Sequence, residues 1–146
     1  MNALSVLQSF TGKVFTQSPS PFMVWLAPVV LLAEEGHLEF EYKVRPEWLN
    51  PAGNLHGGVT AAIIDDVLGA TMFSLNEPFF YSTINNTIDY FSAAVEGDVL
   101  IAETRIIKRG RQFINAQCDI WNADRSRLIA KGYSNLFKTE NKRINK

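Results

Sequence analysis

Residues 56–75 read HGGVTAAIIDDVLGATMFSL, and this stretch decides the fold. Its apolar residues fall on every side of a helix, interrupted only by Asp65, Asp66 and a few small residues. A helix that is apolar all round is normally a buried one. The stretch therefore predicts a long helix at the centre of the molecule.

Patterns typical of β-strands lie on both sides of this helix. Before it, residues 29–34 and 38–45 form two segments around a turn at Glu35 and Gly36, which predicts a hairpin. After it, turns at residues 96–98, 109–111 and 122–124 divide the chain into four further strands. In the third of these, apolar residues at 114, 116, 118 and 120 alternate with polar ones, so one face of the sheet is expected to meet water.

A short amphipathic helix is predicted near the N-terminus. Apolar residues recur there at helical spacing between residues 2 and 16, and the two prolines of residues 17–21 would end the helix. The order of elements predicts a single α+β domain over residues 1–146, with a core at about 21–138. In this fold, one curved antiparallel sheet wraps the long central helix.

Composition excludes several classes of function. Fourteen basic and 15 acidic residues give a net charge of -1, which favours neither nucleic-acid nor membrane partners. One cysteine and two histidines are too few for a disulfide framework or an ordinary zinc site, so no metal is expected. The longest apolar run, residues 22–33, is too short to span a bilayer. We therefore expect a cytoplasmic protein.

The start of the long helix is suited to binding an oxyanion. Gly57 and Gly58 remove Cβ atoms where a ligand would approach the backbone, and the first amides of a helix have no partners within it. The positive end of the helix adds attraction for a carbonyl oxygen that gains negative charge. The sequence therefore predicts an oxyanion site at this junction.

The carboxylates at 65 and 66 also need an explanation, because an unpaired carboxylate in an apolar helix costs on the order of several kcal/mol. His56 and Asp65 are about 13 Å apart along the helix, so they cannot meet within one chain. If the helix start at His56 and the carboxylate of Asp65 act on one substrate, they must come from two subunits whose long helices run antiparallel. Small residues on the stripe of Asp65, which is shared by Ala61, Ala62, Gly69 and Met72, would permit that approach.

At this point the chain resembles the PaaI-like acyl-CoA thioesterases of the hotdog superfamily. The matching residues are Asn50-Pro51-Ala52-Gly53, His56-Gly57-Gly58, Asp65, Asp89-Tyr90-Phe91, Arg109-Gly110-Arg111 and Ala130-Lys131-Gly132. The resemblance runs from about Pro21 to Lys138. It implies a hotdog fold, homodimers that usually pair into tetramers, and hydrolysis of an acyl-CoA substrate without a metal or organic cofactor.

The resemblance also implies roles for single residues. Asp65 would act as the nucleophile or the general base, and Gly57 would polarise the thioester carbonyl through its backbone amide. His56 would orient the thioester or the helix start. Asn50 would position substrate or water, and Thr83 would lie near the attacking water.

The same resemblance places the substrate between subunits. Cations at the turn of Lys108, Arg109, Gly110 and Arg111 would meet the phosphates of CoA. Gly58 would contact the substrate at the helix start. The acyl group would lie beside an apolar cluster, Met72, Phe73, Phe79, Phe80 and Tyr81.

Other interpretations stay open. His56 could simply cap the helix, the turn cations could be solvated, and Asp66 is expected to pair structurally. Two further functions remain, namely a hydratase or dehydratase acting on acyl-thioesters and a non-catalytic acyl-CoA-binding module. Asp65 argues against the binding module, and the pattern of Asn50, Gly57 and Asp65 differs from the acid-base pair of hydratases.

Overall fold

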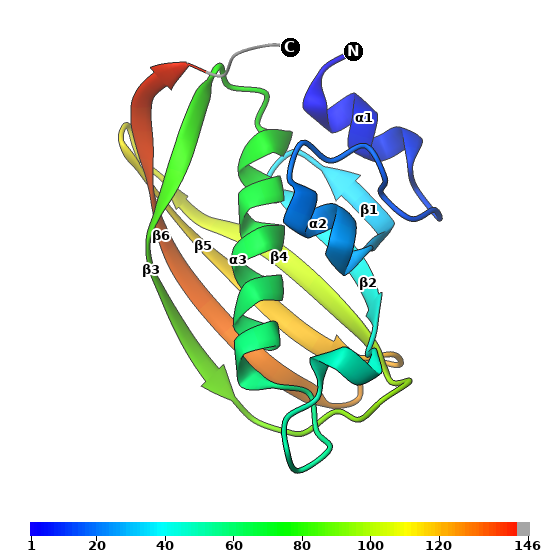
Figure 1. Cartoon of the computed structure of the whole chain (residues 1–146). Coiled ribbons are helices and arrows are strands. Elements are labelled where there is room, and N and C mark those ends of the chain that lie inside the picture. The colour runs from blue at the N-terminus through cyan, green and yellow to red at the C-terminus, as the bar shows by residue number, and fades with distance from the viewer. Residues whose placement is uncertain (143–146) are drawn as a thin grey trace.

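Helix α3 (Gly57–Ser74) lies in the hollow of one curved antiparallel sheet, which confirms the predicted α+β class (Figure 1). The structure is a computed structural model and describes residues 1–142, so residues 143–146 of the predicted domain lie outside the described part. Ile63, Ile64, Val67 and Leu68 of α3 are fully buried, as the apolar pattern of this helix predicts.

The sheet has six strands: β1 (Val29–Glu34), β2 (His37–Lys43), β3 (Phe79–Tyr90), β4 (Val99–Arg109), β5 (Phe113–Asn122) and β6 (Leu128–Lys142). Their order is β1-β2-β4-β5-β6-β3, and all neighbours are antiparallel. The hairpin of β1 and β2 is confirmed. The expectation that the last four strands follow one another through short turns is wrong for β3, which lies at the far edge beside β6 rather than beside β4.

The inner face of the sheet packs tightly on α3. The predicted inner residues of β5, at 114, 116, 118 and 120, are completely buried, and burial raises the pKa of the Cys118 thiol. Opposite Ile64, the chain has Gly132 on β6, where an added Cβ would lie 2.6 Å from the Ile64 Cγ2 atom. Glycine is needed there because the helix and the sheet approach each other so closely.

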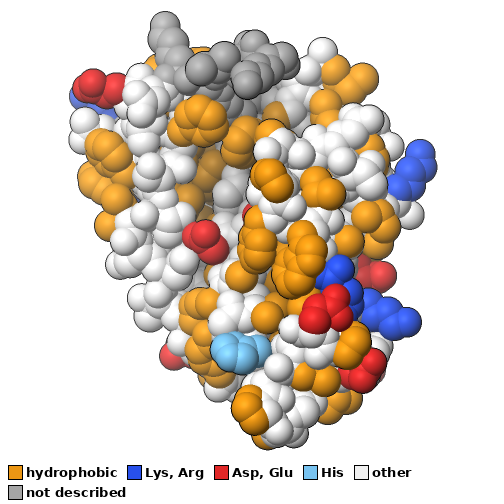
Figure 2. Space-filling model, viewed as in Figure 1, with side chains coloured by type: hydrophobic (Ala, Val, Ile, Leu, Met, Phe, Trp, Pro, Cys, Tyr) orange, Lys and Arg blue, Asp and Glu red, His pale blue; other side chains and the backbone are white. Residues whose placement is uncertain are grey.

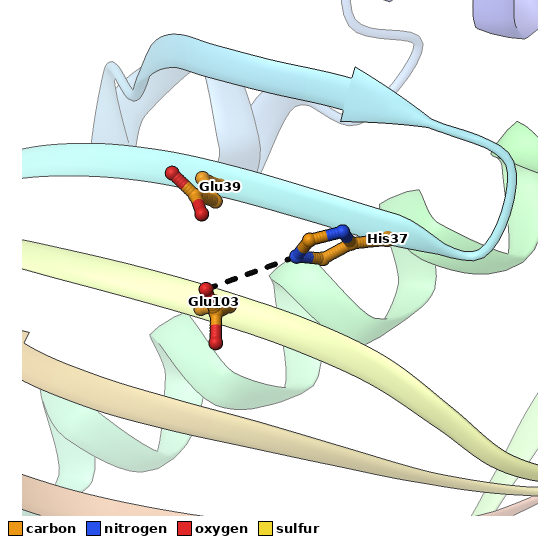
Figure 3. Close-up of side chains that lie close together, drawn as sticks. All are labelled: His37, Glu39 and Glu103. Atoms are coloured by element: carbon orange, nitrogen blue, oxygen red, sulfur yellow. Dashed lines mark ion pairs between the residues drawn. The ribbon is translucent and has the colours of Figure 1, made fainter.

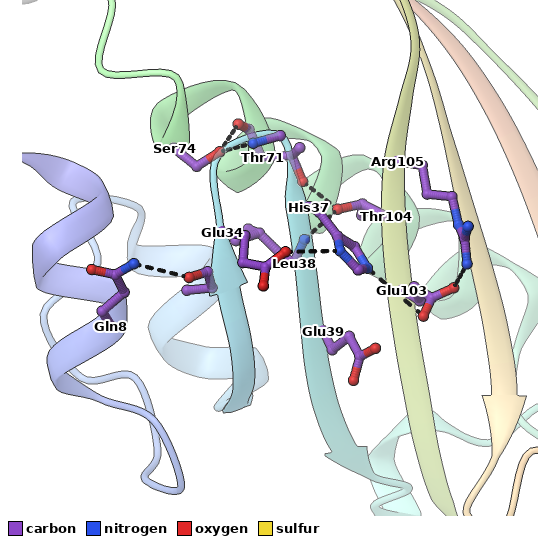
Figure 4. Close-up of polar contacts among 12 residues, drawn as sticks. Gln8, Glu34, His37, Leu38, Glu39, Thr71, Ser74, Glu103, Thr104 and Arg105 are labelled. Atoms are coloured by element: carbon purple, nitrogen blue, oxygen red, sulfur yellow. Dashed lines mark hydrogen bonds and ion pairs between the residues drawn. The ribbon is translucent and has the colours of Figure 1, made fainter.

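Polar contacts fix the C-terminal end of α3 to the sheet (Figure 4). The Thr71 and Thr104 hydroxyls lie 2.7 Å apart, and Thr104 accepts the Leu38 amide at 3.0 Å. The Ser74 hydroxyl accepts the Gly36 amide at 2.9 Å. These bonds satisfy buried polar groups and set the position of the helix along β2 and β4.

The N-terminal region differs from its prediction in two respects. Helix α1 (Ala3–Ser9) ends well before residue 16, since Thr11 and Val14 pair with β1 instead. A second helix, α2 (Pro21–Leu26), forms where the prolines were expected only to end a helix, and a 3-10 turn, η1 (Pro46–Trp48), follows β2. Among residues 1–142, no helix combines the length and the apolar character needed to cross a bilayer.

Candidate active site

The start of α3 leaves one amide free. His56 is the N-cap residue, and its Nδ1 atom accepts the Gly58 N–H at 2.8 Å. The Val59 and Thr60 amides both donate to the His56 carbonyl oxygen, at 2.9 and 3.1 Å. Among residues 1–142, the Gly57 N–H has no acceptor. Of the four first-turn amides, the one that the sequence assigned to the oxyanion is therefore the one available to a ligand.

His56 acts here as a helix cap. Nδ1 is the acceptor of this cap, so Nε2 is the ring nitrogen left for other contacts. A Cβ on residue 58 would lie 3.0 Å from that Nδ1 atom, so glycine at this position leaves room for the imidazole ring. This geometry agrees with the interpretation of His56 as a helix cap, and it commits the Gly58 amide to the cap; a role of His56 toward the thioester stays a prediction.

Asn50 shapes the loop that leads into α3. Its Oδ1 atom accepts the amides of Ala52 and Asn54, at 2.9 and 3.0 Å. Gly53 takes a φ of 80° in the same loop, a left-handed conformation that glycine adopts without steric cost. The Asn50 side-chain NH2 has no acceptor within the described residues, so it remains able to donate to substrate or water.

Asp65 lies on the exposed stripe of α3 and is held from strand β3. The Thr83 hydroxyl donates to Asp65 Oδ1 at 3.0 Å, and the Asn86 side-chain NH2 donates to the same atom at 3.1 Å. The predicted pair of Asp65 and Thr83 is thus brought together. Asn86 was not predicted as a site residue, since the sequence shows only that this strand is unusually polar.

Asp66 has a different environment, and the expectation that it pairs structurally is wrong. Within the described part of the chain, its buried Oδ2 atom has no hydrogen-bond partner. Burial, followed by the nearby charge of Asp65, raises the pKa of Asp66 to about 7. One residue along a helix turns the side chain by about 100°, which takes Asp66 off the exposed stripe and into the packed side.

Three of the four predicted CoA-binding residues line one cavity. Lys108, Gly110 and Arg111 border a space of about 690 Å³ at the turn between β4 and β5, which is also lined by Gln112, Phe113, Asn115 and Asn135. Arg109 faces elsewhere, because it forms ion pairs with Glu77 and, at 3.3 Å, with Glu35. Those pairs would have to open before Arg109 could reach a phosphate.

The residues predicted around the acyl group include a buried one and others that lie nearer the surface. Met72 is 2% exposed and belongs to the core. The Tyr81 hydroxyl donates to Glu77 Oε2 at 2.5 Å. Burial alone would raise the pKa of Glu77, but hydrogen bonds from Tyr81, Arg109 and Lys138 hold it at about 2. Phe80 is exposed at the sheet edge, so the apolar cluster reaches the surface there.

Residues 1–142 hold one group of potential metal ligands, on the outer face of the sheet (Figure 3). The ligand atoms of His37, Glu39 and Glu103 lie within 4.8 Å of one another. However, Arg125 pairs with Glu39 at 2.7 Å and with Glu103 at 2.9 Å, and Arg105 also pairs with Glu103 (Figure 4). Guanidinium groups already supply the positive charge, so this group is an ion-pair network.

These features define a class of protein. A long helix in the hollow of a six-stranded antiparallel sheet is the arrangement of a PaaI-like hotdog protein. The sequence profile of the Thioesterase superfamily matches residues 52–129, more than half of the chain. The chain belongs to this superfamily.

Individual relatives agree with this assignment. Human acyl-coenzyme A thioesterase 13 is 28% identical over 100 residues, which cover 68% of this chain and 71% of the relative. A hypothetical thioesterase of Streptococcus pneumoniae, solved with coenzyme A, is 28% identical, with a TM-score of 0.71 over 75% of this chain and 84% of that one. A putative thioesterase of Ralstonia eutropha, related to phenylacetic acid degradation, is 25% identical, with a TM-score of 0.78 over 93% and 99%.

Proposed function

We propose that this protein hydrolyses acyl-CoA thioesters to a free acid and CoA, at sites shared between two subunits. Asp65 of one protomer and the free Gly57 amide of its partner would act on the same thioester carbonyl. The observation that carries the proposal is that Gly57 alone, among the first-turn amides of α3, has no acceptor within residues 1–142. The names of the human and pneumococcal relatives supply the substrate class.

The two groups lie too far apart to act within one chain. Eight residues separate Gly57 from Asp65, which corresponds to about 12 Å along the helix axis. Two α3 helices packed antiparallel would bring the start of one beside the middle of the other. The stripe around Asp65 suits such packing, since Ala61, Ala62 and Gly69 are small and remain partly exposed.

The sheet edge supports the same dimer. Strand β3, 12 residues long, pairs with β6 on one side and, within residues 1–142, has no neighbouring strand on the other. Ile84 and Tyr90 of this strand, and Phe91 just after it, are more than half exposed. Proteins seldom leave so long an edge strand uncovered. Figure 2 shows the face with α3 and β3, where hydrophobic side chains gather over α2 and acidic and basic side chains lie beside them.

Hydrolysis would follow one of two routes. As a general base, Asp65 takes a proton from water, whose oxygen bonds to the carbonyl carbon; the C–S bond then breaks, and the CoA thiolate recovers the proton. As a nucleophile, the carboxylate itself bonds to that carbon and expels the thiolate, and water then opens the resulting anhydride. In both routes the carbonyl oxygen becomes negative, and the Gly57 N–H stabilises that charge.

The phosphates of CoA would bind at the cavity beside Lys108 and Arg111. Both cations are exposed and have no ion-pair partner within residues 1–142, in contrast to Arg109. Pairing of the dimers into tetramers and the cytoplasmic location stay predictions.

The test uses two substitutions at Gly57 beside one at Asp65. Gly57→Pro deletes the N–H at the first helical position, where proline is well tolerated, and Gly57→Ala keeps the N–H. An alanine Cβ would lie 3.4 Å from the Tyr90 ring, an ordinary contact. We expect Asp65→Asn and Gly57→Pro to lower kcat for thiol release about 100-fold or more, while Gly57→Ala stays near wild type. Unchanged turnover in Asp65→Asn would exclude the mechanism.

A further inference from the structure

The two oxygen atoms of the Asp65 carboxylate are not equivalent. Both hydrogen bonds to this side chain, from Thr83 and from Asn86, end on Oδ1. Within residues 1–142, Oδ2 accepts none. An ionised carboxylate has lone pairs on both atoms, so the uneven arrangement leaves one oxygen engaged and the other open.

Asn86 owes its orientation to a buried serine. Asn86 and Ser134 are opposite one another in the pairing of β3 with β6, and the Ser134 hydroxyl donates to Asn86 Oδ1. Ser134 is only 1% exposed. If the amide turned over, its carbonyl oxygen would face the Asp65 carboxylate, and both groups can only accept. The serine and the carboxylate together therefore select the orientation in which the NH2 of Asn86 points to Asp65.

The two neighbouring asparagines of β3 have separate tasks. Asn85 Oδ1 accepts from the backbone and side-chain nitrogens of Asn135, at 3.2 and 3.0 Å, and it makes no contact with Asp65. Successive residues of a strand face opposite sides of the sheet. Asn85 therefore belongs to the outer face, whereas Asn86 lies on the face that carries α3.

We propose that Asn86, oriented by Ser134, is a positioning residue for Asp65. With Thr83 it holds Oδ1, so that Oδ2 is the atom that reacts, whether it accepts a proton from water or attacks the carbonyl carbon. This inference rests on the proposed function, because it gives Asp65 its reacting atom.

The experiment compares Asn86→Ala and Ser134→Ala with Asn85→Ala as the matched control. The control also removes a cross-strand hydrogen bond from an asparagine of β3, but at a distance from Asp65. For each variant, kcat and KM are measured with one acyl-CoA. The melting temperature and oligomeric state of each are recorded to identify losses that come from folding or assembly.

We expect Asn86→Ala to lower kcat about 10- to 100-fold, as the loss of a hydrogen bond to a charged group would, with little change in KM. Ser134→Ala should lower kcat in the same way but by less. Asn85→Ala should match wild type. A merely structural role for Asn86 would lower the melting temperature and leave kcat at the value of Asn85→Ala.

Two outcomes separate the failure of this inference from that of the proposed function. If Asp65→Asn is inactive but Asn86→Ala has the kcat of Asn85→Ala, the positioning role is wrong and the proposed function stands. If Asp65→Asn keeps full turnover, the proposed function itself is wrong. Should Asn86→Ala fold poorly, Asn86→Leu replaces it, because this side chain has a similar shape and has no N–H to donate.

Discussion

The hydroxyl of Tyr90 donates a hydrogen bond to the carbonyl oxygen of Gly57, at 3.0 Å. This bond joins the last residue of the edge strand β3 to the first residue of α3. The Tyr90 ring also lies 3.4 Å from the position that a Cβ on residue 57 would take. The residue that carries the free amide is therefore held by a side chain from the strand that we place at the subunit interface.

Tyr90→Phe should reduce turnover more than stability. The change keeps the ring and removes one neutral hydrogen bond, which contributes about 0.5–1.5 kcal/mol to stability. We expect kcat to fall roughly 3- to 10-fold, because a less constrained helix start aligns its amide less well with the carbonyl. Steady-state kinetics with Tyr133→Phe, on β6, as the control would check this. Equal kcat in the two variants would argue against the role of Tyr90.

Asp66 should make the protein less stable at alkaline pH. Its pKa is about 7 in the folded chain, above the ordinary value of 3.8. Between these two pH values the folded state keeps a proton that the unfolded state has released. The free energy of unfolding therefore falls as the pH rises from about 4 to about 7, and it levels off above that range.

Asp66→Asn should remove this pH dependence. We expect the variant to be more stable than wild type at pH 8 by about 2 kcal/mol, a value reduced for the part of the side chain that water reaches. At pH 5 the two proteins should differ little. Urea unfolding at both pH values measures the difference. A stability difference that is equal at pH 5 and pH 8 would show that Asp66 is not the group responsible.

The cations at the β4–β5 turn should act on substrate binding alone. Lys108→Ala and Arg111→Ala should each raise KM for an acyl-CoA about 3- to 10-fold, because each removes a contact to a phosphate. KM for the matching acyl-pantetheine, which lacks the nucleotide, should not change. Arg105→Ala removes a cation from the outer face at a distance from the cavity and serves as the control. An equal rise in KM with both substrates would place the nucleotide elsewhere.

Gly132→Ala should destabilise the fold. The added methyl group would lie 2.6 Å from Ile64 Cγ2, so the helix or the sheet must move. Such overpacking costs about 1–3 kcal/mol. The double variant of Gly132→Ala and Ile64→Ala should lose less stability than the two single variants lose together, since the shorter side chain at 64 makes room for the added methyl group. Denaturant unfolding of the four proteins tests this, and strictly additive losses would contradict the close contact.

Much of the fold could be predicted because local patterns carry it. The all-round apolar stretch at 57–74 and the alternation in β2 and β5 depend only on which faces are buried. The pairing of strands could not be predicted in this way. Alternation of apolar and polar residues shows which face of a strand is buried, but not which strand lies beside it, and the position of β3 beside β6 was missed. Helix α2 had a readable signal, because Ser20 caps it and Pro21 occupies its first position.

The site was predicted in part for similar reasons. Gly57 and Asp65 stand at recognisable positions of one helix, so their separation follows from helical geometry. The ion pairs of Arg109 and the bond from Asn86 to Asp65 join residues that lie far apart in the sequence. Only the folded chain brings such residues together. The orphaned oxygen of Asp66 likewise depends on the surrounding side chains and not on its own neighbours in the sequence.

The central claim is that each active site takes Asp65 from one subunit and Gly57 from the other. Its most direct test is the coexpression of two inactive chains, Asp65→Asn and Gly57→Pro, followed by an assay of thiol release. In a mixed dimer one site then carries both defects and the other carries none, so random pairing should restore about a quarter of wild-type activity. If the mixed dimers form and remain as inactive as either parent, the two residues do not meet across the interface.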